Sequence, residues 1–155
     1  MLTIVQAVTD EQIVAARTLF REYETSMEPD LCFQGFEDEL LGLPGKYVKP
    51  DGRLLLAYHD DRLAGCIAMR KLEDGICEMK RLFAREEFRG RKVGISLIDH
   101  LIAEARSVGY SKMRLDTHPP KMGKAVKLYE SLGFSSILPY YNNPNDDVLF
   151  MELTL

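Results

Sequence analysis

Hydrophobic residues follow two different spacings along the chain, and together these predict a mixture of strands and helices. Six stretches are dense in apolar and β-branched residues and are bounded by turn-forming residues, as strands usually are. One of these stretches is long enough for a hairpin, with its turn at Asp60-Asp61. The predicted strand regions are 2–8, 52–72, 76–84, 111–117, 134–141 and 147–155.

Four other stretches repeat apolar residues at intervals of three and four, which is the spacing of one helix face. Asp10 is placed to cap the first helix, and Gly109 and Gly133 are placed to end the last two. The third stretch is the most regular, because Val93 and Leu97 begin a row of apolar residues spaced four apart. The predicted helices are 10–27, 33–43, 93–108 and 123–132.

The order of these elements predicts the fold class. A strand-rich first half is followed by strand, helix, strand, helix and two more strands, as in an α+β or mixed α/β domain with a single sheet. The chain of 155 residues contains no internal repeat or linker. We therefore expect one domain over residues 1–155, large enough to bury a core.

The charge of the chain is uneven, and this limits the ligands to be expected. The formal net charge of −4 argues against a general nucleic-acid binder. Between Met79 and Gly94, however, six basic and two acidic residues give that segment alone a charge of +4. A local positive field suits a small, strongly anionic ligand better than a long polyanion.

The cysteines and the hydropathy of the chain indicate where in the cell the protein is expected. The three cysteines are odd in number and lack the spacing of metal ligands, so we expect reduced thiols, no metal site and a cytoplasmic protein. No run approaches the ~18 apolar residues of a membrane helix, so no membrane partner is expected.

The sequence FRGRKVG, residues 88–94, stands directly at the start of the predicted helix 93–108. A helix start exposes about four backbone N–H groups and a partial positive charge, which together attract anions. Gly90 permits close approach, and Gly94 is expected to give room where the helix packs on the sheet. Phosphate is the predicted ligand, and a solvated basic loop is the alternative. The nucleotide-binding patterns GxxxxGK[ST] and GxGxxG do not occur.

Several motifs, in order, resemble those of the GNAT N-acetyltransferases. RGRKVG is similar to the family's R/Q-x-x-G-x-G/A loop for the pyrophosphate of acyl-CoA. CEMKRLFA resembles the family's fourth strand, KMRLDT its fifth, and AVKLYESLGF its closing helix with the LYxxLGF signature. The likeness covers essentially the whole chain and is strongest from Glu78 to Phe134. It implies a mostly antiparallel sheet of about seven strands with about four helices, in which strands four and five splay apart.

Acetyl-CoA is the co-substrate that this resemblance implies. Its pantetheine arm would pair with the backbone of Leu82, Phe83 and Ala84, where the Leu82 N–H would donate to the thioester carbonyl. Lys92 replaces the family's usual glycine, and we expect it to have helical backbone angles; a strained positive φ is the alternative. Met122 replaces an asparagine common in the family, so a cofactor contact by that side chain is not expected. The pyrophosphate would bind the loop of Arg89, Gly90, Arg91, Lys92, Val93 and Gly94.

Direct attack by an amine requires a proton donor for the departing thiolate. Tyr129 matches the family tyrosine that donates to the CoA sulfur. The alternative for Tyr129 is simple packing of a helix residue against the sheet, because Leu128 and Leu132 are its neighbours in sequence.

The proton acceptor is less clearly marked. Alternation along the fourth strand places Glu78 on the face that carries Leu82, so Glu78 is the first candidate for the base. A salt bridge with Lys80, Arg81 or Arg114 is an equal alternative for this carboxylate. Two further candidates for the base are His118 and a water molecule, whereas Asp116 is expected to be structural.

The acceptor site is predicted from the first two helices and the last hairpin, which usually set specificity in this family. Aromatic side chains beside polar groups suit a small amine, although each could equally serve as packing. The candidate substrate residues are Tyr23, Phe33, Tyr140, Tyr141 and Asn142.

Taken together, the resemblance implies an enzyme that moves an acetyl group from acetyl-CoA to a primary amine of a small molecule by direct attack. The alternatives are an acetyltransferase acting on a protein amine, a non-catalytic acyl-CoA-binding module that senses or scaffolds, and a plain phosphate-binding domain. A homodimer through edge strands near the C-terminus is compatible with this fold.

Overall fold

The computed structural model describes residues 1–27, 35–143 and 147–155, and the side chains of 119–123 lie outside this description. The strands are β1 (Leu2–Gln6), β2 (Arg53–His59), β3 (Arg62–Glu73), β4 (Ile76–Ala84), β5 (Lys112–Thr117), β6 (Ser135–Ile137) and β7 (Leu149–Thr154). The helices are α1 (Asp10–Met27), α2 (Phe36–Leu41), α3 (Val93–Val108) and α4 (Pro119–Ser131), with a short 3₁₀ turn, η2, at Glu86–Phe88.

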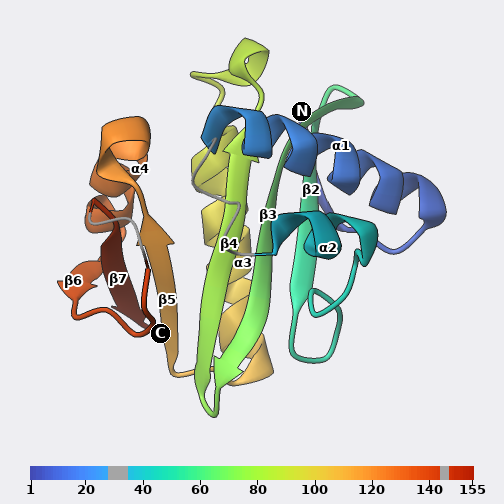
Figure 1. Ribbon diagram of the computed structural model, residues 1–155. Helices are drawn as coiled ribbons and strands as arrows, with labels where there is room; N and C mark the ends of the chain where they lie inside the picture. Colours follow the sequence, from blue (N-terminus) through green and yellow to red (C-terminus); the bar gives the residue numbers. More distant parts are fainter. Residues whose placement is uncertain (28–34, 144–146) are drawn as a thin grey trace.

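All seven strands form one sheet, in the order β1-β2-β3-β4-β5-β7-β6. Every neighbouring pair is antiparallel except β4 and β5, which run parallel. Figure 1 shows α1 and α2 lying over one face of the β1–β4 part of the sheet and α3 behind the other face. The predicted fold, a mostly antiparallel seven-stranded sheet with four helices, is confirmed.

A hydrophobic core lies on each face of the sheet. Behind it, Leu97 and Leu101 of α3 are fully buried against the strands, and burial of each such side chain stabilises the fold by about 1.5–3 kcal/mol. In front of it, Phe20 of α1 and Leu40 of α2 pack on Leu56 of β2. The helix-spaced apolar residues of the sequence are therefore the inward faces of these helices.

The best-predicted elements are those with strong local signals. Asp60 and Asp61 both have positive φ, 49° and 66°, as a two-residue hairpin turn between β2 and β3 requires. Helix α3 has the predicted bounds, and Gly109 ends it with φ 104°.

The start of α1 differs from prediction by one residue. Asp10 is the first residue of the helix, and the cap is Thr9, whose hydroxyl accepts a hydrogen bond from the Gln12 N–H at 3.2 Å. The Gln12 side chain in turn accepts one from the Thr9 N–H at 3.0 Å. This reciprocal arrangement is a capping box, so the Asp10 carboxylate is left to interact favourably with the helix dipole.

Two predicted bounds near the C-terminus are wrong. Helix α4 begins at Pro119 rather than near Gly123, because proline is tolerated in the first turn of a helix, where its missing N–H would be unpaired anyway. The strand predicted over 134–141 is only three residues long, since Leu138 is exposed and Pro139 cannot donate a ladder hydrogen bond. Tyr140 and Tyr141 therefore lie in the bend that follows β6.

Strands β4 and β5 pair over only three residue pairs, from Ile76↔Lys112 to Glu78↔Arg114. Beyond Glu78 the two strands diverge, as Figure 1 shows toward the arrowhead of β4. This confirms the predicted splay of strands four and five. The opening exposes the β5-facing edge of the second half of β4.

A β-bulge changes the facing of side chains along β4. Phe83 pairs with Cys66 and Lys80 with Ala68, so β4 holds one more residue than β3 between these pairs. Arg81 in the bulge has φ 60°. The predicted alternation, with Leu82 on the face of Glu78, is therefore wrong: Leu82 packs into the core on the α3 side of the sheet.

Candidate active site

The splay between β4 and β5 forms a small cavity of about 20 Å³, enough for roughly one water molecule. Both strands contribute to its wall, and a tyrosine from α1 and one from α4 close it. The cavity therefore lies where the resemblance places the reacting thioester. Its lining residues are Tyr23, Met79, Lys80, Arg81, Leu82, Leu115, Asp116, Thr117 and Tyr129.

Tyr129, the predicted proton donor, lines this cavity and is only 3% exposed. Its ring packs on Phe134, with the ring centroids 5.6 Å apart. Burial raises the pKa of Tyr129, with further contributions from Tyr23 and Asp116, so its hydroxyl keeps its proton at neutral pH. The packing alternative and the donor role are thus compatible, because the ring packs while the residue faces the cavity.

Asp116, expected to be structural, lines the same cavity as Tyr129. Its carboxylate accepts a hydrogen bond from the Tyr141 hydroxyl, which itself accepts one from Asn143 Nδ2 at 2.9 Å. Burial raises the pKa of Asp116, although Lys80 acts in the opposite direction. The sequence gives little indication that Asp116 faces the cavity. Alternation along β5 does not reveal that the second half of β5 lacks a pairing partner on β4.

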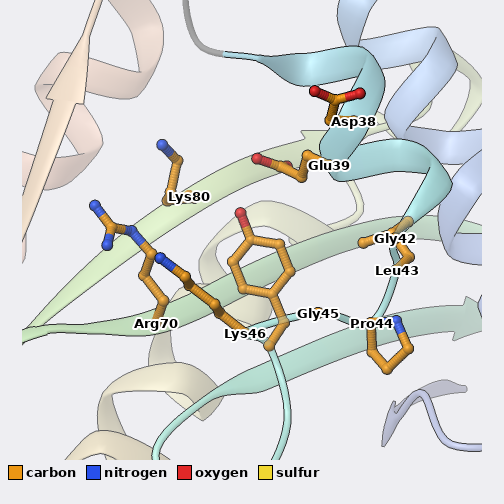
Figure 2. A pocket seen from close by; sticks show the side chains of 10 residues that line it. Asp38, Glu39, Gly42, Leu43, Pro44, Gly45, Lys46, Arg70 and Lys80 are labelled. Carbon is orange, nitrogen blue, oxygen red and sulfur yellow. The ribbon is translucent and has the colours of Figure 1, made fainter.

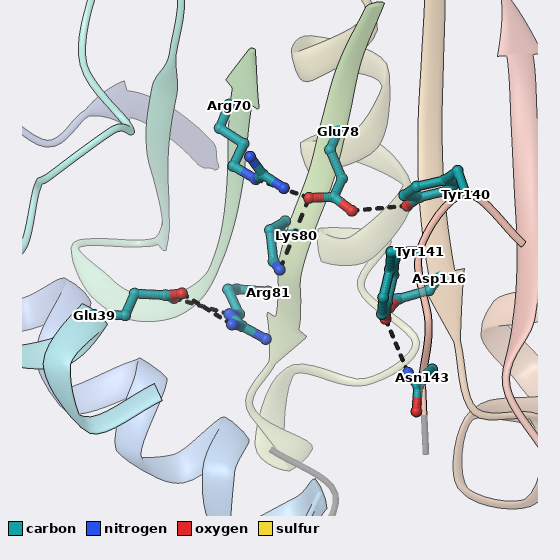
Figure 3. A network of polar contacts seen from close by, with 9 residues as sticks. All are labelled: Glu39, Arg70, Glu78, Lys80, Arg81, Asp116, Tyr140, Tyr141 and Asn143. Carbon is teal, nitrogen blue, oxygen red and sulfur yellow. Dashed lines mark hydrogen bonds and ion pairs between the residues drawn. The ribbon is translucent and has the colours of Figure 1, made fainter. Parts of the chain in front are cut away.

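Glu78, the predicted base, is buried beside the cavity and already engaged by three side chains (Figure 3). One carboxylate oxygen accepts a hydrogen bond from Arg70 Nε at 2.8 Å and lies 3.8 Å from Lys80 Nζ. The other accepts the Tyr140 hydroxyl at 2.7 Å. The salt-bridge alternative for Glu78 is therefore realised with Lys80 and with Arg70, which stands directly across from it on β3. Arg114 pairs instead with Glu152.

Arg81, in the bulge, forms a second buried ion pair with Glu39 of α2. Its guanidinium donates two hydrogen bonds of 2.9 Å to the two oxygens of that carboxylate. The same group lies 4.9 Å from the ring centre of Phe36 and 5.8 Å from that of Tyr23. This pair joins α2 to the strand that the cofactor is expected to contact, and Figure 3 shows it beside Lys80.

Of the predicted substrate residues, the structure brings three to this region. Tyr23 lines the cavity, while Tyr140 and Tyr141 bond to the carboxylates of Glu78 and Asp116. Asn142 is exposed, and Phe33 lies outside the described residues. His118, a second candidate for the base, is buried at the N-cap of α4 and is not among the residues that line the cavity.

The loop before α3 has the geometry of an anion-binding helix start. Gly90 has φ 79° and Lys92 has φ 62°, so two residues in this loop have left-handed backbone angles. No side chain caps α3 at Lys92, which leaves the N–H groups of the first turn available for a ligand. Arg89 and Arg91 are exposed and form no ion pair with any residue that the structure describes.

The expected helical backbone angles for Lys92 are wrong. As the N-cap residue with φ 62° and ψ 23°, Lys92 occupies the conformation that the family's usual glycine would adopt without steric cost. The cost to a lysine is about 1–2 kcal/mol. Lys92 thus adds a positive charge to the loop but also strain.

The role expected for Gly94 is also wrong. A Cβ at Gly94 would have no atom within 4 Å, so this glycine faces open space rather than the sheet. Close packing occurs instead at Gly65 of β3, where a Cβ would lie 3.1 Å from a Val93 methyl carbon and 2.5 Å from the Phe83 carbonyl oxygen. Gly90 and Gly94 both keep space open beside the helix start, as a bound pyrophosphate needs. The loop therefore fits the predicted ligand.

A larger pocket of about 370 Å³ lies between α2, the segment that follows it, and strands β3 and β4 (Figure 2). Lys80 lines both this pocket and the cavity, so the two spaces share a wall. No motif in the sequence indicates this pocket, because residues from distant segments meet to form it. Its lining residues are Asp38, Glu39, Gly42, Leu43, Pro44, Gly45, Lys46, Tyr47, Arg70 and Lys80.

Comparison with known proteins decides the family. The model of the acetyltransferase (GNAT) family matches residues 8–134. The chain belongs to the GNAT family. Among GNAT relatives, an uncharacterized N-acetyltransferase of Schizosaccharomyces pombe is 40% identical, over 90% of this chain and 86% of that protein. One from Dictyostelium discoideum is 33% identical, over 94% of this chain and 95% of that protein.

The solved structures show the same GNAT fold. The PaiA N-acetyltransferase of Thermoplasma acidophilum, solved in complex with coenzyme A, superposes with a TM-score of 0.77. It is 17% identical, over 100% of this chain and 99% of that one, so this likeness concerns the fold alone. As a GNAT protein, the chain is an acyltransferase enzyme of a fold that binds acyl-CoA. None of the helices in the described ranges is long and apolar enough to cross a membrane.

Proposed function

We propose that this GNAT enzyme transfers an acetyl group from acetyl-CoA to the primary amine of a small molecule. One observation carries the proposal: the cavity lined by Tyr129 and Asp116 shares the Lys80 wall with the 370 Å³ pocket. A pocket of this size suits a small molecule rather than an extended protein segment. An amine held there can reach the thioester from the side of β4 that carries Lys80.

The acyl donor is proposed to bind along the open edge of β4 and at the start of α3. Arg89, Arg91 and Lys92 attract the pyrophosphate, and the uncapped N–H groups of α3 bind it. The backbone of Leu82 to Ala84 holds the pantetheine arm, and the Leu82 N–H stabilises negative charge on the thioester oxygen. When bound, acetyl-CoA supplies the activated acetyl group, and the protein supplies orientation and proton transfer.

Two side chains at the cavity serve proton transfer. Asp116 is better placed than Glu78 to accept the amine proton, because it lines the cavity while both oxygens of Glu78 are occupied. Its raised pKa makes it a stronger base than an ordinary aspartate. Tyr129 then protonates the departing thiolate, and Glu78 holds Tyr140 and Arg70 in position.

A thiol-release screen of acetyl-CoA against a broad panel of small amines, with Tyr129→Phe as the variant, tests this proposal. We expect at least one amine to release CoA, and Tyr129→Phe to lower kcat about 100-fold or more with little change in the KM for acetyl-CoA. The phenylalanine ring keeps the packing on Phe134, so the melting temperature should change little.

The same screen separates the enzyme from a non-catalytic acyl-CoA-binding module. The module would bind CoA in a calorimetric titration, yet no amine would release thiol and Tyr129→Phe would change nothing. That result would overturn the proposed activity. A protein of either kind should prefer CoA to ADP, which a plain phosphate-binding domain would not.

A further inference from the structure

The 370 Å³ pocket is unusually rich in cations for a site that is to receive an amine. Lys46, Arg70 and Lys80 line it, against two carboxylates, Asp38 and Glu39. The two carboxylates are not equivalent, because Glu39 already accepts two hydrogen bonds from Arg81. Figure 2 shows Arg70, Lys46 and Lys80 gathered at one side of the pocket, with Asp38 on α2 at the other.

The Arg70 guanidinium is fixed by one hydrogen bond and keeps other N–H groups available to a ligand. Its Nε donates to Glu78 at 2.8 Å, which fixes the plane of the guanidinium. Its two terminal nitrogens donate no hydrogen bond to any residue that the structure describes, and the side chain is 27% exposed. A guanidinium fixed through Nε with a free pair of N–H groups matches the two oxygens of a carboxylate.

The lysines extend this arrangement. Lys80 is mostly buried, and its ion-pair contact within the described residues is a long one, 3.8 Å to Glu78. Lys46 is exposed on the segment after α2 and forms no ion pair within the described part of the chain. Burial lowers the pKa of Lys80, as expected for an ammonium group that lacks a close partner.

From these contacts we infer that the acceptor amine also carries a carboxylate, which binds Arg70 with Lys46 and Lys80 beside it. This inference rests on the proposed function. Three cations and two carboxylates line the pocket, a balance of one positive charge that suits a monoanionic carboxylate better than a dianionic phosphate. Because Lys80 also borders the cavity, a compact molecule bound in this way directs its amine toward Tyr129 and Asp116. The expected substrate class is thus the amino acids and similar amino-carboxylates.

The test compares amino acids with their primary amides and their decarboxylated amines, each set sharing one side chain, in the thiol-release assay. Phosphorylated amines form a further arm. We expect the amino acid to exceed its amide about 10- to 100-fold in kcat/KM, the range of a charge-assisted hydrogen-bonded pair. Arg70→Gln should abolish this preference by raising the KM for the acceptor, while the KM for acetyl-CoA stays the same.

Because Arg70 also contacts Glu78, Arg70→Gln could act by disturbing the structure. Two further variants control for this. Lys46 lies on an exposed segment, so Lys46→Gln should reduce the preference for the amino acid over its amide without affecting the fold. Lys71→Gln, next to Arg70 but outside the pocket and paired with Asp74, should leave the preference unchanged. Equal rates for acid and amide, a preference for phosphorylated amines, or a preference that survives Arg70→Gln would overturn the inference while leaving the proposed acetyl transfer intact.

A titration that needs no turnover separates the two proposals. The N-acetylated amino acid, as the expected product, is titrated against its amide in the presence of CoA. Binding of the acid alone, lost in Arg70→Gln, supports the carboxylate site even if no amine in the screen is acetylated. Equal or absent binding of both compounds counts against it.

Discussion

Two regions of the molecule contain several cationic side chains but differ in what balances their charge. The loop of residues 88–94 presents exposed cations without ion-pair partners among the described residues, and no side chain caps the N–H groups at the start of α3. The polar network around β4 is mostly buried, and Arg70 and Arg81 each contact a carboxylate. The first region is arranged for a ligand that brings its own charge, whereas the second is already mostly neutralised by the protein.

This difference predicts how each region responds to substitution. An exposed cation in the loop can be lost with little effect on folding, because nothing buried depends on it. A cation removed from the network leaves a buried carboxylate without its partner, which is among the costliest single changes in a protein.

Arg81→Met should cause the largest loss of stability. It removes the guanidinium that binds both oxygens of Glu39, whose side chain is only 20% exposed, so we expect the free energy of unfolding to fall by about 3 kcal/mol in urea denaturation. Arg21→Met is the matched control, since Arg21 forms a similar two-bond pair with Glu37 in an exposed position. The control should unfold almost like the wild type. Similar losses in both variants would contradict the distinction between the two environments.

The contribution of the Arg81–Glu39 pair to folding stability depends on pH, because it requires the Glu39 carboxylate to be ionised. Burial alone would raise the pKa of Glu39, but the hydrogen bonds and charge of Arg81 outweigh it and hold this pKa below its ordinary value. The stabilisation is therefore present above the unfolded pKa near 4.5 and is lost as the pH falls through the lower folded pKa. The difference in stability between wild type and Arg81→Met should narrow under those acidic conditions.

Asp116→Asn should separate activity from stability. If Asp116 accepts the amine proton, kcat falls about 100-fold in the thiol-release assay. Because burial raises the pKa of Asp116, its ionisation destabilises the folded state as the pH rises from the unfolded value near 3.8 through the folded pKa. The asparagine does not ionise and still accepts the Tyr141 hydrogen bond, so the variant should melt at a higher temperature at neutral pH.

Asp99→Asn, at an exposed position on α3, is the control for both effects and should change neither activity nor melting temperature. Normal turnover in Asp116→Asn would exclude this carboxylate as the base, and Glu78, His118 or a water molecule would remain as candidates. A fall in melting temperature would show instead that ionised Asp116 stabilises the fold.

Lys92→Gly should have the smallest effect, and it tests the loop. Compared with Lys92→Ala, which also removes the charge but keeps a Cβ at φ 62°, the glycine variant should be more stable by about 1 kcal/mol. The affinity for CoA should change by no more than about threefold in calorimetric titration, since backbone N–H groups remain. A large loss of affinity in both variants would show that the ammonium of Lys92 itself is essential for phosphate binding.

The parts of the molecule that could be predicted from the sequence are those encoded over short distances. Helix α3 and the Asp60-Asp61 turn each depend on residues close in sequence, and the order of the strand and helix motifs was sufficient to indicate the fold. The backbone of Lys92 was mispredicted because a residue's type favours but does not determine its φ.

The missed features depend on contacts between distant segments. The bulge at Arg81 interrupts the alternation of β4, and nothing local indicates that Arg81 will pair with Glu39 of α2. Asp116 faces the cavity only because the second half of β5 lacks a β4 partner. Arg70 enters the site through its cross-strand pairing with Glu78, a register that the sequence alone does not specify.

The three-pair contact between β4 and β5 has a mechanical consequence. Strands β1–β4 form one half of the sheet and β5–β7 the other, and within the described residues the β-ladder that joins these halves is confined to Ile76–Glu78 of β4 and Lys112–Arg114 of β5. Beyond this point the two halves are held together by the core that they share on the α3 side of the sheet rather than by ladder hydrogen bonds. A ligand bound in the opening would contact both halves, and its binding would therefore add to the stability of the folded protein.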